Sequence, residues 1–234
     1  TVPLMCMTPG MPAAPQTKKR RQLANSRWIT GGHEMRRPSV LVLNAGSSSL
    51  KYALFEAGQG GARIAGGAVT GIGTDTAQFK LTATGDAKVV ERGDAFPDHR
   101  AALDAVVSEV RSDRLAAFPV AVGHRVAHGG PDCDCPEEVT PDLLARLRNL
   151  VTLAPLHLPA NIAGIEAIAA LRPDLPQIAC FDTAFHRAHP WVNDTFALPR
   201  EWYERGVRRY GFHGLSSEYV SGEIARLEPE LRHG

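Results

Sequence analysis

The sequence lacks the features that mark several large classes of protein. Its formal net charge is only +1, so no overall field favours nucleic acid or an acidic membrane surface as a partner. None of its apolar runs approaches the roughly 18 residues of a membrane-spanning helix. Four cysteines in 234 residues do not make a disulfide framework. These absences favour a soluble protein in a reducing, cytoplasmic setting, without nucleic-acid or membrane partners.

Two motifs that would place a ligand are also missing. The phosphate-binding pattern G-x-x-x-x-G-K-[S/T] does not occur. Cys133 and Cys135 are one residue apart, which departs from the C-x₂₋₄-C spacing of zinc sites, and no second pair lies nearby. We therefore predict a surface loop at 133–135 rather than a metal site.

Residues 1–34 differ in character from the rest of the chain. They contain four prolines within the first fifteen residues, a basic run at 18–21 and no sustained apolar periodicity. Such a segment cannot bury enough apolar surface to offset the entropy of ordering, so we expect it to be disordered. No apolar core comes after the basic run, which argues against a secretory signal. We expect Met35, just before the first predicted strand, to be the natural start.

The most informative stretch is 39–56, SVLVLNAGSSSLKYALFE. An apolar run at 40–43 is followed by the turn-forming residues NAGSSS at 44–49, and apolar residues then return at period two. This pattern predicts a strand, a polar turn and a second strand. A turn of Asn, Gly and Ser exposes donors that suit the oxygens of a phosphate or a metal-bound phosphate. An ordinary serine-rich hairpin is the alternative interpretation.

The rest of the chain alternates between strand and helix patterns. Thr140 is suited to cap a helix that begins at Pro141, and Pro97 is suited to the first position of another helix. This succession predicts an α/β domain with a mixed sheet. The predicted strands are 62–70, 78–84, 87–92, 119–126 and 177–181, and the predicted helices are 97–112, one from 141, 160–172 and 215–227.

Five stretches, in order, resemble motifs of the acetokinase family, which includes acetate and propionate kinases. They are 39–56, VGHRVAHGG at 122–130, APLH at 154–157, FDTAFH at 181–186 and YGFHG at 210–214. The resemblance extends from about Met35 to the end. It implies an actin-like, sugar-kinase-like (ribonuclease H-like) α/β fold with two related domains and the active site between them. Residues 35–187 would form the first domain, and 188–234 would begin the second.

The resemblance also implies a reaction. Members transfer a phosphoryl group reversibly from ATP to acetate, giving acetyl phosphate and ADP, with Mg²⁺, or Mn²⁺ in its place. They are commonly homodimers through the second domain. Two alternatives remain open: a propionate kinase of the same family, and an inactive remnant that lacks the nucleotide domain.

Family motifs assign five residues to the phosphate side of the site. Asn44 would lie near the magnesium ion, although it could simply start the turn. Ser47, Ser48, Ser49 and Lys51 would lie beside the reacting phosphate, although Lys51 could be a solvated strand residue. These residues supply neutral or positive groups, which suit phosphoryl oxygens.

Arg125 and Asp182 are the two charged residues predicted for catalysis. A guanidinium matches a carboxylate or phosphoryl group at two points, and the family role of Arg125 is to hold both. Asp182 comes directly after a buried strand, where ligand-facing acids of α/β sheets lie, and would orient magnesium waters or the carboxylate. A helix cap or an ion pair is the alternative for Asp182. A general base is not central, because a carboxylate substrate is ionised near neutral pH.

Two histidines complete the predicted site. His213 matches the family histidine that hydrogen-bonds the transferring phosphoryl group, and His157 matches another active-site histidine. Either could instead be an ordinary packed or surface residue. His124 and His186 are interpreted as supporting residues.

Ala127 bears on the choice of substrate. Many acetate kinases have valine at this place in the motif, where it bounds the pocket for the substrate methyl group. Alanine leaves out two methyl groups, each worth about 0.8 kcal/mol of burial, so the extra room could admit propionate. Compensation by a neighbouring side chain is the alternative.

Some family features have no counterpart here. Leu158, Leu215 and Ser217 stand where asparagine, threonine and histidine are common. Family members continue well beyond the position of Gly234, into Gly-rich nucleotide loops, a second active-site arginine and a glutamate near the metal. We therefore expect this chain to carry about half of an active site and to expose apolar surface where the remainder would pack.

Overall fold

The structure is a computed structural model that describes residues 36–58, 60–85, 89–112 and 115–233. The predictions for 1–34 and for Met35 lie outside the described residues. The described strands are β1 (Arg37–Ala45), β2 (Ser49–Glu56), β3 (Arg63–Thr70), β4 (Gln78–Ala83), β5 (Val89–Gly93), β6 (Ala117–Val126), β7 (Glu137–Glu138) and β8 (Gln177–Phe181). The described α-helices are α1 (His99–Val110), α2 (Pro141–Asn149), α3 (Leu158–Leu171), α4 (Arg200–Glu204) and α5 (Gly214–Leu227).

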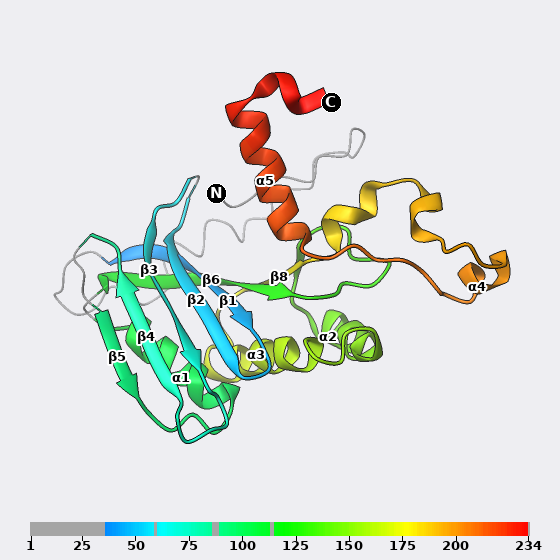
Figure 1. The fold of residues 1–234 in the computed structure, drawn as a ribbon. Helices are drawn as coiled ribbons and strands as arrows, with labels where there is room; N and C mark the ends of the chain where they lie inside the picture. Colours follow the sequence, from blue (N-terminus) through cyan, green and yellow to red (C-terminus); the bar gives the residue numbers. More distant parts are fainter. Residues whose placement is uncertain (1–35, 59, 86–88, 113–114, 234) are drawn as a thin grey trace.

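The strands form one mixed sheet, as predicted (Figure 1). Their order is β5-β4-β3-β2-β1-β6-β8-β7. The strands from β1 to β5 form an antiparallel meander, whereas β1, β6 and β8 are parallel neighbours. The carboxyl ends of the three parallel strands therefore meet at one edge, which is where open α/β sheets bind ligands.

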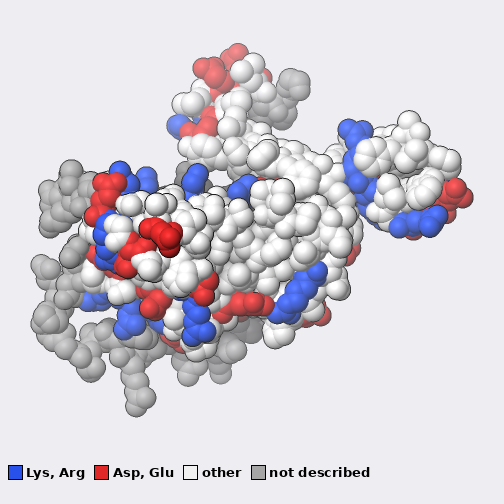
Figure 2. Space-filling view, turned by 60° about the horizontal axis from the view of Figure 1, so that its bottom comes forward, with Lys and Arg blue, Asp and Glu red and all other residues white. Residues whose placement is uncertain are grey.

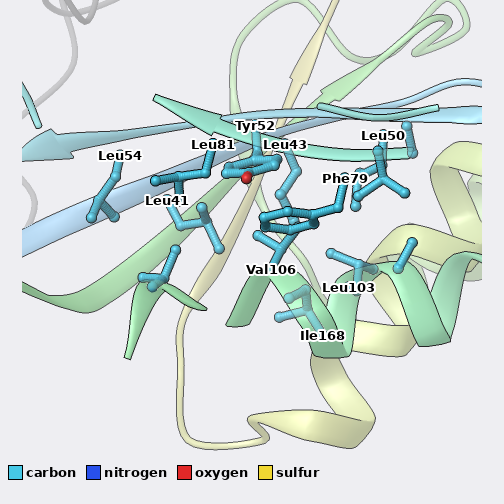
Figure 3. Packing of buried hydrophobic residues seen from close by; sticks show 14 of the residues in the cluster. Leu41, Leu43, Leu50, Tyr52, Leu54, Phe79, Leu81, Leu103, Val106 and Ile168 are labelled. Atoms are coloured by element: carbon cyan, nitrogen blue, oxygen red, sulfur yellow. The ribbon is translucent and has the colours of Figure 1, made fainter. Parts of the chain in front are cut away.

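Helices α1, α2 and α3 cover one face of this sheet (Figure 1). The larger core joins the β1–β4 half to α1 and α3, with Leu41, Leu50, Tyr52 and Phe79 against Val106 (Figure 3). A second core joins β6 and β8 to α2 and α3. Alternate residues of β1 and β2 are buried, which is the period-two pattern of the sequence. Core packing thus fixes the strand register, and with it the side chains at the strand ends.

Side-chain caps set the starts of α1 and α2. The Oγ1 atom of Thr140 accepts from the backbone N–H of Leu143, so the predicted cap is confirmed. The predicted helical position of Pro97 is wrong, because the Asp98 carboxylate caps α1 and the helix begins at His99. Helix α3 begins at Leu158, two residues earlier than predicted, with Pro159 in its first turn. Proline suits that turn because its missing N–H has no helical partner there.

Beyond β8 the chain leaves the sheet. Figure 1 shows the segment around α4 projecting from the body, and α5 standing on the side of the sheet opposite α1–α3. The buried carboxylate of Asp194 anchors this segment by accepting from Arg187 at 3.0 Å. Large apolar side chains are exposed here, among them Trp191, Trp202 and Ile224. This part of the described chain therefore exposes apolar surface, and its packing against a further part of the protein stays a prediction.

Both signs of charge occur together on the face in Figure 2. Lys and Arg side chains lie beside Asp and Glu on the left and lower parts of the view, and much of the remaining surface is uncharged. Several pairs are exposed ion pairs, such as Arg148 with Glu166. Exposed pairs contribute little to stability, so the apolar cores are the main support of the fold.

Candidate active site

The parallel strands bring Asn44, Arg125 and Asp182 together. Leu43 pairs with His124 in the β1–β6 register, so the next residues along each strand, Asn44 and Arg125, lie beside each other. Arg125 pairs with Cys180 on β8, and Asp182 comes directly after that strand. Strand register alone therefore places three residues that are distant in the sequence at one point.

Hydrogen bonds join these three side chains. The guanidinium of Arg125 donates from Nε, at 3.0 Å, and from Nη2 to Oδ2 of Asp182. Its Nη1 donates to Oδ1 of Asn44 at 3.1 Å. A guanidinium has five N–H donors, so these three bonds orient Arg125 and leave two donors for an oxygen-bearing ligand. Asp182 is 3% exposed, whereas the Arg125 side chain is 38% exposed. The acid is thus a buried anchor and the guanidinium faces the site.

A pocket of about 420 Å³ opens beside Arg125. Five predicted site residues line it: Arg125, Ala127, His157, Asp182 and His213. Leu153, Ala154, Pro155, Leu156 and Phe212 complete the lining, which is predominantly apolar. The guanidinium of Arg125, paired with Asp182, stands in a mainly apolar wall, which suits a small ligand with an anionic end and an apolar end.

Two helices begin at this pocket. His157 occupies the N-cap position of α3 and His213 that of α5, and in the described chain neither histidine side chain caps its helix. Each helix N-terminus carries about half a positive charge, which attracts anions. At the start of α5, the backbone N–H of Gly214 is not available to a ligand, because it donates to the main-chain oxygen of Asp182 at 2.7 Å. Both helix starts therefore add to the positive field of Arg125.

The serine turn is not part of the same lining. Among the described residues that line the pocket, Ser47, Ser48, Ser49 and Lys51 do not occur. The turn nevertheless comes soon after Asn44, and Lys51 is the antiparallel partner of Asn44 on the next strand. Its Ser47 and Ser48 are exposed. The residues of the turn thus lie next to Asn44 and Arg125 but do not line the pocket. The sequence predicts that a phosphate binds beside this turn.

Residues that the sequence analysis missed hold this turn and the strand ends. The ring of His99, at the start of α1, hydrogen-bonds the main-chain oxygen of Gly46 at 2.6 Å. Asn161 of α3 binds the main chain at both Ala45 and Ala127. Buried Asn within the apolar face of a helix is a signal that could have been noticed, because such a group must find partners.

His128 is the third missed residue. It is 1% exposed and its ring packs edge-on against Tyr210, with the ring centroids 4.4 Å apart, and against Phe212. Its Nδ1 accepts from the backbone N–H of Gly130. Burial lowers the pKa of His128, which favours the neutral ring. The loop after β6 is thereby packed against the segment that carries His213.

The other histidine of the motif is structural, as predicted. Burial lowers the pKa of His124 to about 4, with partial opposition from its hydrogen bond to Gln177. That bond is 2.7 Å long and links β6 with β8. His186 bonds the main-chain oxygen of Phe212 at 3.0 Å, which supports the approach to His213.

The cysteine loop differs from the prediction in one respect. Cys133 is 1% exposed and belongs to the second core, so it is not a surface residue. Burial raises the pKa of its thiol to about 12, which disfavours the thiolate that metals bind. Asp134 is exposed, as expected for the loop. Within the described residues no group of three or more metal-ligating side chains occurs, and no helix is long and apolar enough to cross a bilayer.

Comparisons with known proteins agree with the motifs. A sequence model of the Acetokinase family matches residues 39–230. Acetate kinase of Nitrobacter hamburgensis is 46% identical over 203 residues, covering 84% of this chain and 49% of that protein. Acetate kinase of Deinococcus radiodurans is 46% identical over 191 residues, covering 80% and 47%. The chain spans about half the length of the curated relatives it matches.

Solved structures show the same relationship. Porphyromonas gingivalis acetate kinase matches with a TM-score of 0.74 and 38% identity, over 81% of this chain and 49% of that one. A propionate kinase from Francisella tularensis matches with a TM-score of 0.75 and 31% identity, over the same shares. The mixed sheet is therefore the predicted actin-like α/β fold. Because the family match extends over nearly the whole described chain, the protein belongs to the acetokinase family.

Proposed function

We propose that the protein carrying this chain transfers a phosphoryl group reversibly from ATP to acetate, giving acetyl phosphate and ADP. The observation that carries the proposal is the small apolar pocket at which Arg125 and two helix N-termini converge. Acetate has one anionic end and one methyl group, and the pocket offers a complement to each. Membership of a kinase family supplies the phosphoryl donor.

The two remaining donors of Arg125 would hold the acetate carboxylate and then a phosphoryl oxygen. One carboxylate oxygen attacks the γ-phosphorus, and the bond from that phosphorus to the bridging oxygen of ADP breaks. No proton has to be removed, because acetate is ionised near neutral pH. Asp182 and Asn44 keep Arg125 in place, and His213, beside the start of α5, would donate to the transferring group. Positioning and charge stabilisation are therefore the main contributions of these residues.

The residues fit a nucleotide-bound Mg²⁺, with Mn²⁺ as an alternative. Asp182 accepts both hydrogen bonds from Arg125 at Oδ2, so its other carboxylate oxygen does not bind Arg125. That oxygen and the amide oxygen of Asn44 are hard ligands of the kind that Mg²⁺ prefers. Mg²⁺ commonly keeps several waters and phosphate oxygens and needs only one or two protein carboxylates. When bound, the ion would neutralise charge on the phosphates of ATP.

We propose the remaining assignments on the same basis. Residues 35–187 would form the first domain and 188–234 would begin the second, which is supported by the departure of the chain from the sheet after β8. Ser47, Ser48, Ser49 and Lys51, next to Asn44, would meet the phosphate. A homodimer is supported by the exposed aromatic residues around α4. A cytoplasmic location is supported by Cys133 and Cys180, which form no disulfide within the described residues.

The test is a hydroxamate assay for acyl phosphate with ATP, Mg²⁺ and either acetate or propionate. Arg125→Ala should abolish product formation. Arg148→Ala is the matched control, because Arg148 forms an exposed ion pair with Glu166 and does not line the pocket. Full activity in Arg125→Ala would overturn the proposed role of the pocket.

A second substrate has one specific observation in its favour. Ala127 lines the pocket with a single methyl group, and a propionate kinase is among the structural neighbours. Higher kcat/KM with propionate than with acetate would support the propionate kinase alternative. A folded protein that makes neither acyl phosphate would support the inactive remnant.

A further inference from the structure

Asn161 joins the two strand ends that carry the candidate site. It lies in α3, one turn after His157, and is 5% exposed. Its Nδ2 donates to the main-chain oxygen of Ala45 at 2.7 Å. Its Oδ1 accepts from the backbone N–H of Ala127 at 2.9 Å. One side-chain amide therefore binds the ends of both β1 and β6.

The two main-chain groups held by Asn161 adjoin the site residues. Ala45 comes directly after Asn44, and Ala127 is two residues beyond Arg125. The hydrogen bond from Arg125 to Asn44 spans the same pair of strands. Asn161 thus helps to fix the distance between the ends of β1 and β6, on which the hydrogen bond from Arg125 to Asn44 depends.

The helix is built to reach these strand ends. Gly164 lies one turn after Asn161, and a Cβ atom added there would be 3.3 Å from the Cβ atom of Ala45. A residue with a side chain at this position would hold α3 further from β1. The close approach permits the short bond from Asn161 to Ala45.

Both main-chain groups are also difficult to satisfy otherwise. Ala45 and Ala127 are buried, and each lies where the regular strand pairing ends. A buried N–H or C=O without a partner is costly, so losing the amide would favour local rearrangement. That rearrangement would move Ala127, which lines the pocket, and Asn44 relative to Arg125.

We propose that Asn161 is a positioning residue for the carboxylate end of the reaction, acting through Ala127 and through the Asn44–Arg125 pair. This inference rests on the proposed function. It assigns Asn161 no contact with substrate. Its effect should therefore appear in the kinetic constants for the carboxylate and not in the KM for ATP.

Two variants at Asn161 separate positioning from space filling. Asn161→Leu keeps a similar volume, removes both hydrogen bonds and excludes water. Asn161→Ala also removes both bonds but leaves room in which a water molecule can bridge the two main-chain groups. Positioning predicts that Asn161→Leu is the more damaged enzyme, with kcat/KM for acetate lowered about 100-fold, since misplacement of about 1 Å can have that effect. Space filling predicts the reverse order, because a cavity is then the main defect.

The control is Thr140→Ala, which removes the cap of α2 away from the pocket. Its melting temperature should fall while its KM for acetate stays at the wild-type value. All four proteins are assayed as the complete gene product, with hydroxylamine trapping and with melting temperatures. If Asn161→Leu does not fold, the KM for acetate of Asn161→Ala is compared with that of Thr140→Ala. A higher KM in Asn161→Ala supports the positioning role, and an equal KM contradicts it.

The outcomes distinguish the two proposals. A wild-type protein that makes no acyl phosphate from acetate or propionate overturns the proposed function and this inference with it. An active wild type with Asn161→Ala more damaged than Asn161→Leu, or with both variants kinetically like Thr140→Ala, overturns the inference alone. The expected order, with an unchanged KM for ATP, supports it.

Discussion

Substitution of Ala127 by valine should reverse any preference for propionate. Ala127 lines the pocket, and valine adds two methyl groups at that wall. In the native pocket, burial of the additional CH₂ of propionate contributes about 0.8 kcal/mol, or roughly fourfold in kcat/KM. In Ala127→Val that contribution is lost and overpacking adds about 1–3 kcal/mol, so the propionate-to-acetate ratio should fall at least about 20-fold.

The assay compares kcat/KM for both acids by hydroxamate formation in wild type and variant. Ala121→Val is the matched control, because Ala121 lies on β6, the strand that Ala127 directly follows, is half-buried and does not line the pocket. Its ratio should equal that of the wild type. An unchanged ratio in Ala127→Val would show that Ala127 does not bound the acyl pocket, and the argument for propionate would fail with it.

Three further substitutions test the surroundings of the pocket. Asp182→Asn keeps the shape but removes the charge that Arg125 faces, so kcat/KM for acetate should fall about 10- to 100-fold in the same assay, since a bond to a charged group is worth about 1.5–3 kcal/mol; wild-type kinetics would contradict the anchoring role. Burial lowers the pKa of His124 in the folded protein from 6.5 to about 4. The contribution of the neutral His124 ring to the free energy of unfolding is therefore fully present above pH 6.5 and is lost as the pH falls toward 4. Urea unfolding of His124→Gln should show a smaller pH slope in that window, by about 1.4 kcal/mol per pH unit, and an equal slope would contradict the buried neutral ring. Gly214→Ala places a Cβ atom 2.4 Å from the main-chain oxygen of Asp182, so both the melting temperature and acetate turnover should fall; retention of both would contradict the close approach.

Much of the fold could be predicted because its signals are local. The apolar run at 40–43, the polar turn and the period-two return predicted β1 and β2 to within a few residues. Thr140 marked the start of α2 because a cap acts on its own helix. The prediction from Pro97 was wrong because proline is accepted both at the first helical position and just before a cap. Only the conformation of Asp98 decides between these two positions.

The charged centre was predictable for a related reason. Asn44, Arg125 and Asp182 each stand at the end of a strand, and parallel strands bring their carboxyl ends to one edge. Asn161 and His128 were missed because their partners are main-chain groups and aromatic rings far away in the sequence. Apolar periodicity records burial but not which distant group a buried polar side chain meets.

The hydrogen bonds divide the site into a part that is fixed by the protein itself and a part that is exposed to a ligand. Arg125 and Asp182 satisfy each other, and Asn161 satisfies the strand ends behind them, so this part needs no ligand to keep its geometry. His157 and His213, by contrast, are exposed residues at helix starts. A ligand therefore meets a preorganised guanidinium on the sheet and adaptable groups on the helices. Preorganisation lowers the entropy lost on binding, so changes behind Arg125 should weaken the carboxylate step even where they leave the histidines untouched.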